Sequence, residues 1–102
     1  MNELHAPPLD EKERPVEMAR IWIAAEEGRS HIALNYGIFE ARELEIWGSL
    51  AADLIAHAVR AYHQDGGTAT AAEAFAAIEK GLRERLSDNP TMSGDFSNKV
   101  LM

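Results

Sequence analysis

Residues 18–37 read MARIWIAAEEGRSHIALNYG, and this run predicts a β-hairpin. Large aliphatic side chains recur at every second residue on both sides of Glu27 and Gly28 (Ile21, Ile23, Ile32 and Leu34), as they do where successive residues point to opposite faces of a strand. We place a two-residue turn at Glu27 and Gly28, because glycine readily adopts the positive φ that such turns require. The cross-strand pairs that follow include Trp22–Ala33, Arg20–Asn35 and Ala24–His31.

The same alternation gives the hairpin two different faces. The core face is apolar and carries Ala19, Ile21, Ile23, Ile32, Leu34 and Tyr36. The outer face is mixed and carries Met18, Arg20, Trp22, Ala24, His31, Ala33 and Asn35. Two strands alone are marginal in water and need more strands or a packed helix. We therefore expect helices on the core face and another covering on the outer face.

A long first helix is predicted from about Glu40 to Gln64. Its apolar residues recur at helical spacing and form a stripe that we expect to cover the core face: Leu44, Trp47, Ala51, Leu54, Ile55, Ala58 and Tyr62. Further apolar residues flank the stripe, so the helix should be contacted on more than one side. Gly48 inside the helix suggests a close backbone approach there.

A second helix follows the glycine pair Gly66-Gly67, which ends the first helix at the usual C-terminal position. Thr70 and Glu73 have the spacing of a capping box. We expect this helix to run to about residue 87 and to lie against the first. The predicted class is α+β, a hairpin followed by two antiparallel helices in ββαα order, with the helices packed on one face of the hairpin.

The length of 102 residues favours one domain. We divide the chain into a flexible charged arm over residues 1–15, a domain over 16–87 and a flexible polar tail over 88–102. The small domain would be only modestly stable alone, which favours an oligomer. The chain has no cysteine, so disulfides and thiolate metal sites are excluded.

The charge balance opposes binding to nucleic acid. Seventeen acidic residues against ten basic ones give a net charge of −7, and the basic residues are scattered. No apolar run suits a transmembrane helix or a secretory leader, so we expect a cytoplasmic protein that does not bind membranes.

No catalytic motif is found in the sequence, and we predict no enzyme activity, cofactor or metal. The nearest candidate is Asp53 with His57, four residues apart on the polar side of the first helix. We interpret this pair as a solvated helix surface, with a metal site as the less favoured alternative.

The outer face of the hairpin is the best candidate for function. Its candidate residues for binding or for a dimer face are Met18, Arg20, Trp22, His31 and Asn35. Three coverings remain open: a second subunit, one of the tails of the chain, or a small-molecule ligand. The unpaired backbone groups of a strand edge can also template another strand. We expect a homodimer formed through the hairpin edge or the outer face.

Several motifs resemble a family of small alphaproteobacterial proteins, domain of unknown function 5076, over residues 16 to about 85. They are ARIWI at 19–23, WGxLAADL at 47–54 with x any residue, RAY at 60–62 and GG at 66–67. The resemblance implies a bacterial cytoplasmic protein with a hairpin and two helices, and it carries over no active-site residue. We predict a non-enzymatic homodimeric interaction module; the alternative is a small-molecule-binding domain that uses the outer face around Trp22.

Overall fold

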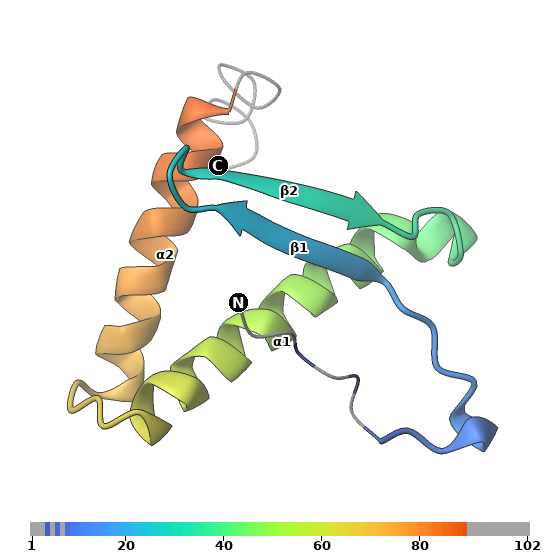
Figure 1. The fold of residues 1–102 in the computed structure, drawn as a ribbon, viewed down its shortest axis with the longest axis horizontal. Coiled ribbons are helices and arrows are strands. Elements are labelled where there is room, and N and C mark those ends of the chain that lie inside the picture. Colours follow the sequence, from blue (N-terminus) through green and yellow to red (C-terminus); the bar gives the residue numbers. More distant parts are fainter. Residues whose placement is uncertain (1–3, 5, 7, 90–102) are drawn as a thin grey trace. The chain divides into compact units, whose positions relative to one another are not determined.

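The computed structural model describes residues 4, 6 and 8–89. Its elements are a 3-10 turn η1 (Glu11–Glu13), strands β1 (Ala19–Ala24) and β2 (Arg29–Leu34), a 3-10 turn η2 (Glu40–Arg42), and helices α1 (Glu43–Gln64) and α2 (Ala71–Asp88) (Figure 1). The antiparallel hairpin followed by two helices confirms the predicted α+β class and ββαα order. The predicted tail, beyond Asp88 and Asn89, lies outside the described residues.

The chain separates into two compact units, divided between Glu43 and Leu44. The first contains the hairpin and the second contains both helices. Packing of the helices on the core face of the hairpin stays a prediction. Within the described part of the chain, no helix is long and apolar enough to cross a membrane.

The hairpin register differs from the predicted one by two residues. The observed pairs are Ala19–Leu34, Arg20–Ala33, Ile21–Ile32, Trp22–His31, Ile23–Ser30 and Ala24–Arg29. A two-residue turn of the predicted type needs positive φ at both central residues, whereas only Gly28 (φ 67°) has it here. The chain instead makes a four-residue loop over residues 25–28, in which the Ala24 carbonyl accepts from the N–H groups of Glu27 (3.0 Å) and Gly28 (2.8 Å).

A shift of two residues preserves the faces, because side chains alternate with a period of two. Ile21, Ile23, Ile32 and Leu34 therefore still share the core face. No apolar side chain is buried in the described chain, and these four are 53–67% exposed. The hairpin by itself thus makes no core.

The segment between β2 and α1 is tied to Glu43, which is only 4% exposed and is the one buried residue of the described chain. Its carboxylate accepts from the backbone N–H groups of Gly37 (3.0 Å) and Phe39 (2.8 Å). Acidic side chains are favourable at a helix N-terminus. Here the carboxylate also satisfies two loop donors, so it sets the path by which the chain enters α1.

The corner between α1 and α2, residues 62–73, matches the predicted stop and start signals. The N–H of Gly66 bonds the His63 carbonyl (3.1 Å) and that of Gly67 bonds the Tyr62 carbonyl (2.9 Å), as in a Schellman motif. Gly66 has a φ of 96°. The two helices thus join at a defined helix stop.

The start of α2 has the predicted capping box. The Glu73 N–H donates to the Thr70 hydroxyl (3.1 Å) and the Thr70 N–H donates to the Glu73 carboxylate (2.9 Å). The backbone N–H of Thr70, and to a smaller extent the Thr70 side chain, lower the pKa of the Glu73 carboxyl group by hydrogen bonding to its ionised form. Two backbone donors that a helix start leaves open are therefore satisfied within the corner.

Candidate functional site

The predicted outer-face residues lie on the hairpin as expected, but the corrected register changes their neighbours. Trp22 lies opposite His31, not Ala33, and Arg20 lies opposite Ala33, not Asn35. Asn35 instead lies opposite Met18, whose carbonyl accepts from the Asn35 N–H at 2.8 Å. The structure therefore separates the candidates into a Trp22–His31 pair on the strands and a group at the open end.

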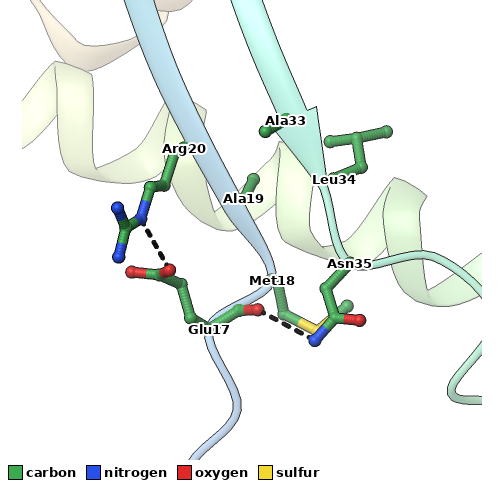
Figure 2. A pocket seen from close by; sticks show the side chains of 7 residues that line it. All are labelled: Glu17, Met18, Ala19, Arg20, Ala33, Leu34 and Asn35. Atoms are coloured by element: carbon green, nitrogen blue, oxygen red, sulfur yellow. Dashed lines mark hydrogen bonds and ion pairs between the residues drawn. The ribbon is translucent and has the colours of Figure 1, made fainter.

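The open end of the hairpin contains a hollow of about 370 Å³. Three of the five predicted site residues line it: Met18, Arg20 and Asn35 (Figure 2). The other lining residues are Glu17, Ala19, Ala33 and Leu34. Trp22 and His31 do not line this hollow. The structure thus brings Met18, Arg20 and Asn35 together and leaves the aromatic pair further along the strands.

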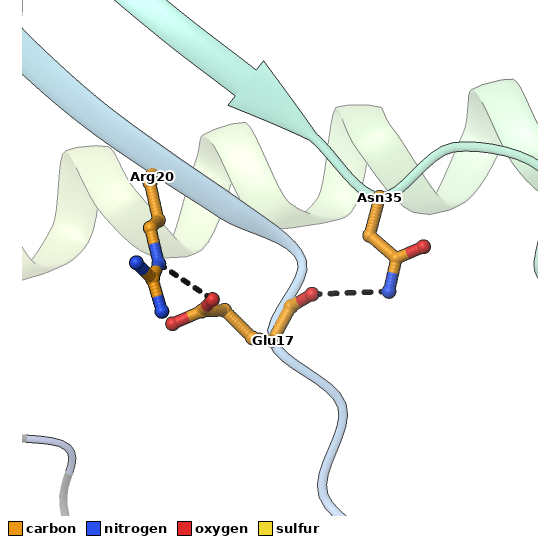
Figure 3. Close-up of polar contacts among 3 residues, drawn as sticks. All are labelled: Glu17, Arg20 and Asn35. Carbon is orange, nitrogen blue, oxygen red and sulfur yellow. Dashed lines mark hydrogen bonds and ion pairs between the residues drawn. The ribbon is translucent and has the colours of Figure 1, made fainter.

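Glu17 organises the polar part of the hollow, as Figure 3 shows. Its carboxylate accepts from Nε of Arg20 at 2.7 Å, and its backbone carbonyl accepts from Nδ2 of Asn35 at 3.2 Å. Sequence reasoning missed Glu17 because it precedes the strand pattern. The correct register places its carbonyl beside Asn35, so that register is the signal that would have found it.

Two exposed ion pairs involve the arginines of the hairpin. Arg20 is paired with Glu17, and both side chains are more than 60% exposed. Arg29, which lies on the outer face opposite Ala24, is paired with Glu27 at 3.1 Å. Exposed pairs of this kind add little stability. Each arginine that could meet an anionic ligand on the hairpin thus already lies beside a carboxylate.

Asp53 and His57 are brought together through the backbone. Nδ1 of His57 lies 2.7 Å from the backbone carbonyl oxygen of Asp53, and not at its carboxylate. Among the described residues, no group of three histidine, aspartate or glutamate side chains could hold a metal ion. On the polar side of α1, His57 therefore contacts the backbone of Asp53, whereas a metal site would need both side chains to face one ion.

An apolar groove of about 640 Å³ lies between α1 and α2. It is lined by Gly48, Ala51, Ala52, Ile55, Ala56, Val59, Ala71, Phe75 and Leu82. The predicted packing of the second helix along the first is therefore wrong: the helices join at the corner and leave this groove. No described atom of the helical unit lies within 4 Å of a Cβ added at Gly48, and the close backbone approach there stays a prediction.

Comparison with known proteins gives a family but no chemistry. The model of a family described as a domain of unknown function (DUF5076) matches residues 3–91. The match is longer than the resemblance found in the sequence, because it includes most of the predicted arm and the start of the predicted tail. Searches of curated proteins and of solved structures found no match.

Proposed function

This chain belongs to the family described as domain of unknown function 5076, and because that description names no activity, we propose from its own residues that it is a non-enzymatic interaction module that works as a homodimer. The predicted bacterial and cytoplasmic setting belongs to the same proposal. In the proposed homodimer, a second copy of the chain binds to the hairpin of the first.

The observation that carries the proposal is that both faces of the hairpin expose large apolar side chains. Ile21 on the core face is 56% exposed and Trp22 on the outer face is 51% exposed. The two helices of the chain are expected to cover the core face of the hairpin, which leaves the outer face without a covering. Burying the second face removes further apolar surface from water, at about 25 cal/mol per Å². In a symmetric dimer both subunits bury the same apolar surface, so each is stabilised by the same amount.

Sedimentation velocity on the full chain tests the homodimer. We expect a dimer at protein concentrations of about 10–100 μM, which requires a dissociation constant of about 1–10 μM, or about −7 to −8 kcal/mol. The variant Trp22→Lys should weaken the dimer by at least about tenfold, because it removes an aromatic side chain and adds a charge to the interface. A wild-type monomer throughout this range would overturn the proposal.

A matched control for Trp22→Lys is Leu9→Lys. Leu9 is 50% exposed, close to the 51% of Trp22, but it lies outside the hairpin. The control adds the same charge to an equally exposed apolar position. Equal weakening by the two variants would show that net charge, and not the hairpin, governs association.

The hollow at the open end supports a second candidate function, binding of a small molecule. Its volume of about 370 Å³ is in the range of small-ligand sites, and Asn35 offers amide groups at its wall. Because Arg20 is already paired with Glu17, a neutral ligand suits the hollow better than an anion. Trp22, the centre of the site predicted from sequence, does not line it.

Thermal-shift screening of a library of neutral metabolites tests this second function. A ligand that binds only the folded chain raises the unfolding midpoint. Asn35→Ala should abolish the rise, whereas Ala56→Ser, in the groove between the helices, should keep it. A hit that survives Asn35→Ala would place the ligand elsewhere.

A further inference from the structure

The hairpin register shows which backbone groups of each strand point outwards. Hydrogen-bonded and non-hydrogen-bonded pairs alternate along an antiparallel ladder. The bond from the Asn35 N–H to the Met18 carbonyl makes Met18–Asn35 a hydrogen-bonded pair. Counting from it along β1, Arg20, Trp22 and Ala24 direct their backbone groups towards β2. The intervening residues direct theirs to the open edge: Ala19, Ile21 and Ile23.

The open edge of β1 is the more apolar of the two, with five apolar residues of six against three of six in β2. Natural edge strands carry charged residues or proline that hinder pairing with another chain. The sequence of β1 is ARIWIA, with Arg20 as its only charged side chain. The sequence of β2 is RSHIAL, with Arg29 at one end and His31 near the middle. In the described chain each strand has only the other as its neighbour.

We infer that β1 pairs antiparallel with β1 of a second copy, with Ile21 on the twofold axis. This inference rests on the homodimer proposed above and assigns it an interface. The two Ile21 residues then exchange backbone hydrogen bonds, and Ala19 pairs with the partner's Ile23. All of these residues have outward backbone groups, so every hydrogen bond of the new ladder has its donor and acceptor. The product is a four-stranded sheet, wide enough to be stable where a two-stranded one is not.

The side chains of β1 are complementary in this register. Arg20 lies opposite the partner's Trp22 on the outer face, and the twofold axis repeats the contact. A guanidinium stacks favourably on the face of an indole ring. Arg20 donates to Glu17 through Nε, which leaves the flat face of its guanidinium available for stacking. Arg20 and Trp22 thus find their partner in another copy of the same strand.

The neighbouring registers are less favourable. Centring the axis on Arg20 would set two arginines directly opposite each other, which destabilises a sheet. Centring it on Trp22 would set the two tryptophans opposite each other and Arg20 opposite the partner's Ala24. That register satisfies the backbone and gains one tryptophan pair, but it loses both contacts between arginine and tryptophan.

An exchange of the two side chains tests the register by sedimentation. W22R sets an arginine opposite the partner's Arg20, and it should weaken the dimer by about tenfold. The double variant R20W/W22R restores a contact between arginine and tryptophan in each half of the interface. It should return the dissociation constant to within about threefold of the wild-type value. If the double variant stays as weak as W22R, the Ile21-centred register is wrong.

Cysteine cross-linking tests the edge independently, and the cysteine-free chain makes each variant single-cysteine. In I21C the two Cα atoms across the axis are about 5.5 Å apart, within disulfide reach. The matched control is I32C, because Ile32 is the cross-strand neighbour of Ile21, shares its face and is also 56% exposed. Its Cα atoms would be three strand spacings apart, about 14 Å, which is too far.

Mild oxidation should therefore give a covalent dimer for I21C and not for I32C on a non-reducing gel. Preferential cross-linking of I32C would assign the interface to the edge of β2. A dimer in sedimentation with no preference between the two variants would overturn the β1 edge while leaving the homodimer intact. Wild-type protein that sediments as a monomer would overturn both.

Discussion

The corner between α1 and α2 and the hairpin are built from similar numbers of residues but satisfy their polar groups differently. In the corner, Tyr62 accepts from the Ala69 N–H (2.9 Å), Nε2 of His63 lies 2.9 Å from the Ala69 carbonyl oxygen, and Thr70 and Glu73 cap α2 reciprocally. In the hairpin, the backbone groups of β1 and β2 bond across one side only. The backbone groups of a turn can find hydrogen-bond partners among nearby residues, whereas those at a sheet edge need another strand.

The same contrast is seen in the apolar side chains. At the corner, the Tyr62 ring lies against Gly67 so closely that it would overlap a Cβ there. On the hairpin, Ile23 is 67% exposed and has its backbone groups at the open edge. Variants in the corner should therefore change the stability of the chain itself. Variants on the hairpin edge should change association.

Gly67→Ala should have the largest effect on stability. The added Cβ displaces the Tyr62 ring, which loses its contact with Gly67 and its hydrogen bond from Ala69. We expect a loss of about 3 kcal/mol in the free energy of unfolding, measured by urea denaturation at fixed protein concentration. The loss should be equal at low and high protein concentration, because the corner lies outside the proposed interface.

Gly81→Ala is the matched control for that variant. A Cβ added at Gly81, inside α2, meets no described atom, and alanine is the better helix former. This change should stabilise the chain by up to about 1 kcal/mol. A similar destabilisation by both substitutions would contradict the assigned role of Tyr62.

Glu43→Gln should have the next largest effect, at the junction between the hairpin and α1. The amide keeps the shape of the side chain but has only one acceptor oxygen, so one of the N–H groups of Gly37 and Phe39 loses its partner. We expect a cost of about 2 kcal/mol in urea denaturation. Glu84→Gln, on the exposed side of α2, should change stability by less than about 0.5 kcal/mol. Equal effects would show that burial of Glu43 contributes nothing.

Thr70→Ala should cost about 1 kcal/mol, the usual worth of an N-cap. The pH dependence has a definite sign. Because the folded pKa of Glu73 lies below its ordinary value of 4.5, the ionised carboxylate stabilises the fold above that value. This contribution is lost as the pH falls from about 4.5 through the folded pKa. In Thr70→Ala this loss should shrink, which denaturation at pH 3 and pH 7 would show.

Glu17→Gln should have the smallest effect, below about 0.5 kcal/mol, because its ion pair with Arg20 is exposed. Its backbone carbonyl still accepts from Asn35. In the proposed dimer Arg20 stacks through its face and not through Nε, so the dissociation constant should change by less than about threefold. A larger weakening in sedimentation would show that Glu17 orients Arg20 for the partner.

The difference between the two regions also explains what could be predicted from sequence. The signals of the corner are local: Gly66-Gly67 stops one helix and Thr70 with Glu73 starts the next, and both predictions are confirmed. The faces of the hairpin were predictable because they depend only on alternation. Its register depends on the conformation of Glu27, which side-chain spacing does not encode.

The site was predictable only in part, for the same reason. Met18, Arg20 and Asn35 do come together, but Glu17, which binds two of them, lies outside the strand pattern. The carboxylate of Glu43 meets loop donors four and six residues before it, a contact that depends on the path of the loop. Features formed between two elements, such as the groove between α1 and α2, have no local signal in the sequence.

The alternation of backbone direction along β1 makes hydrogen exchange a residue-by-residue measure of which side of the strand is covered. The amides of Arg20 and Trp22 point towards β2, so their exchange reports opening of the hairpin itself. The amides of Ile21 and Ile23 point the other way, so their protection reports whatever lies along the open edge. A single time course on six consecutive residues therefore separates folding of the hairpin from occupation of its edge.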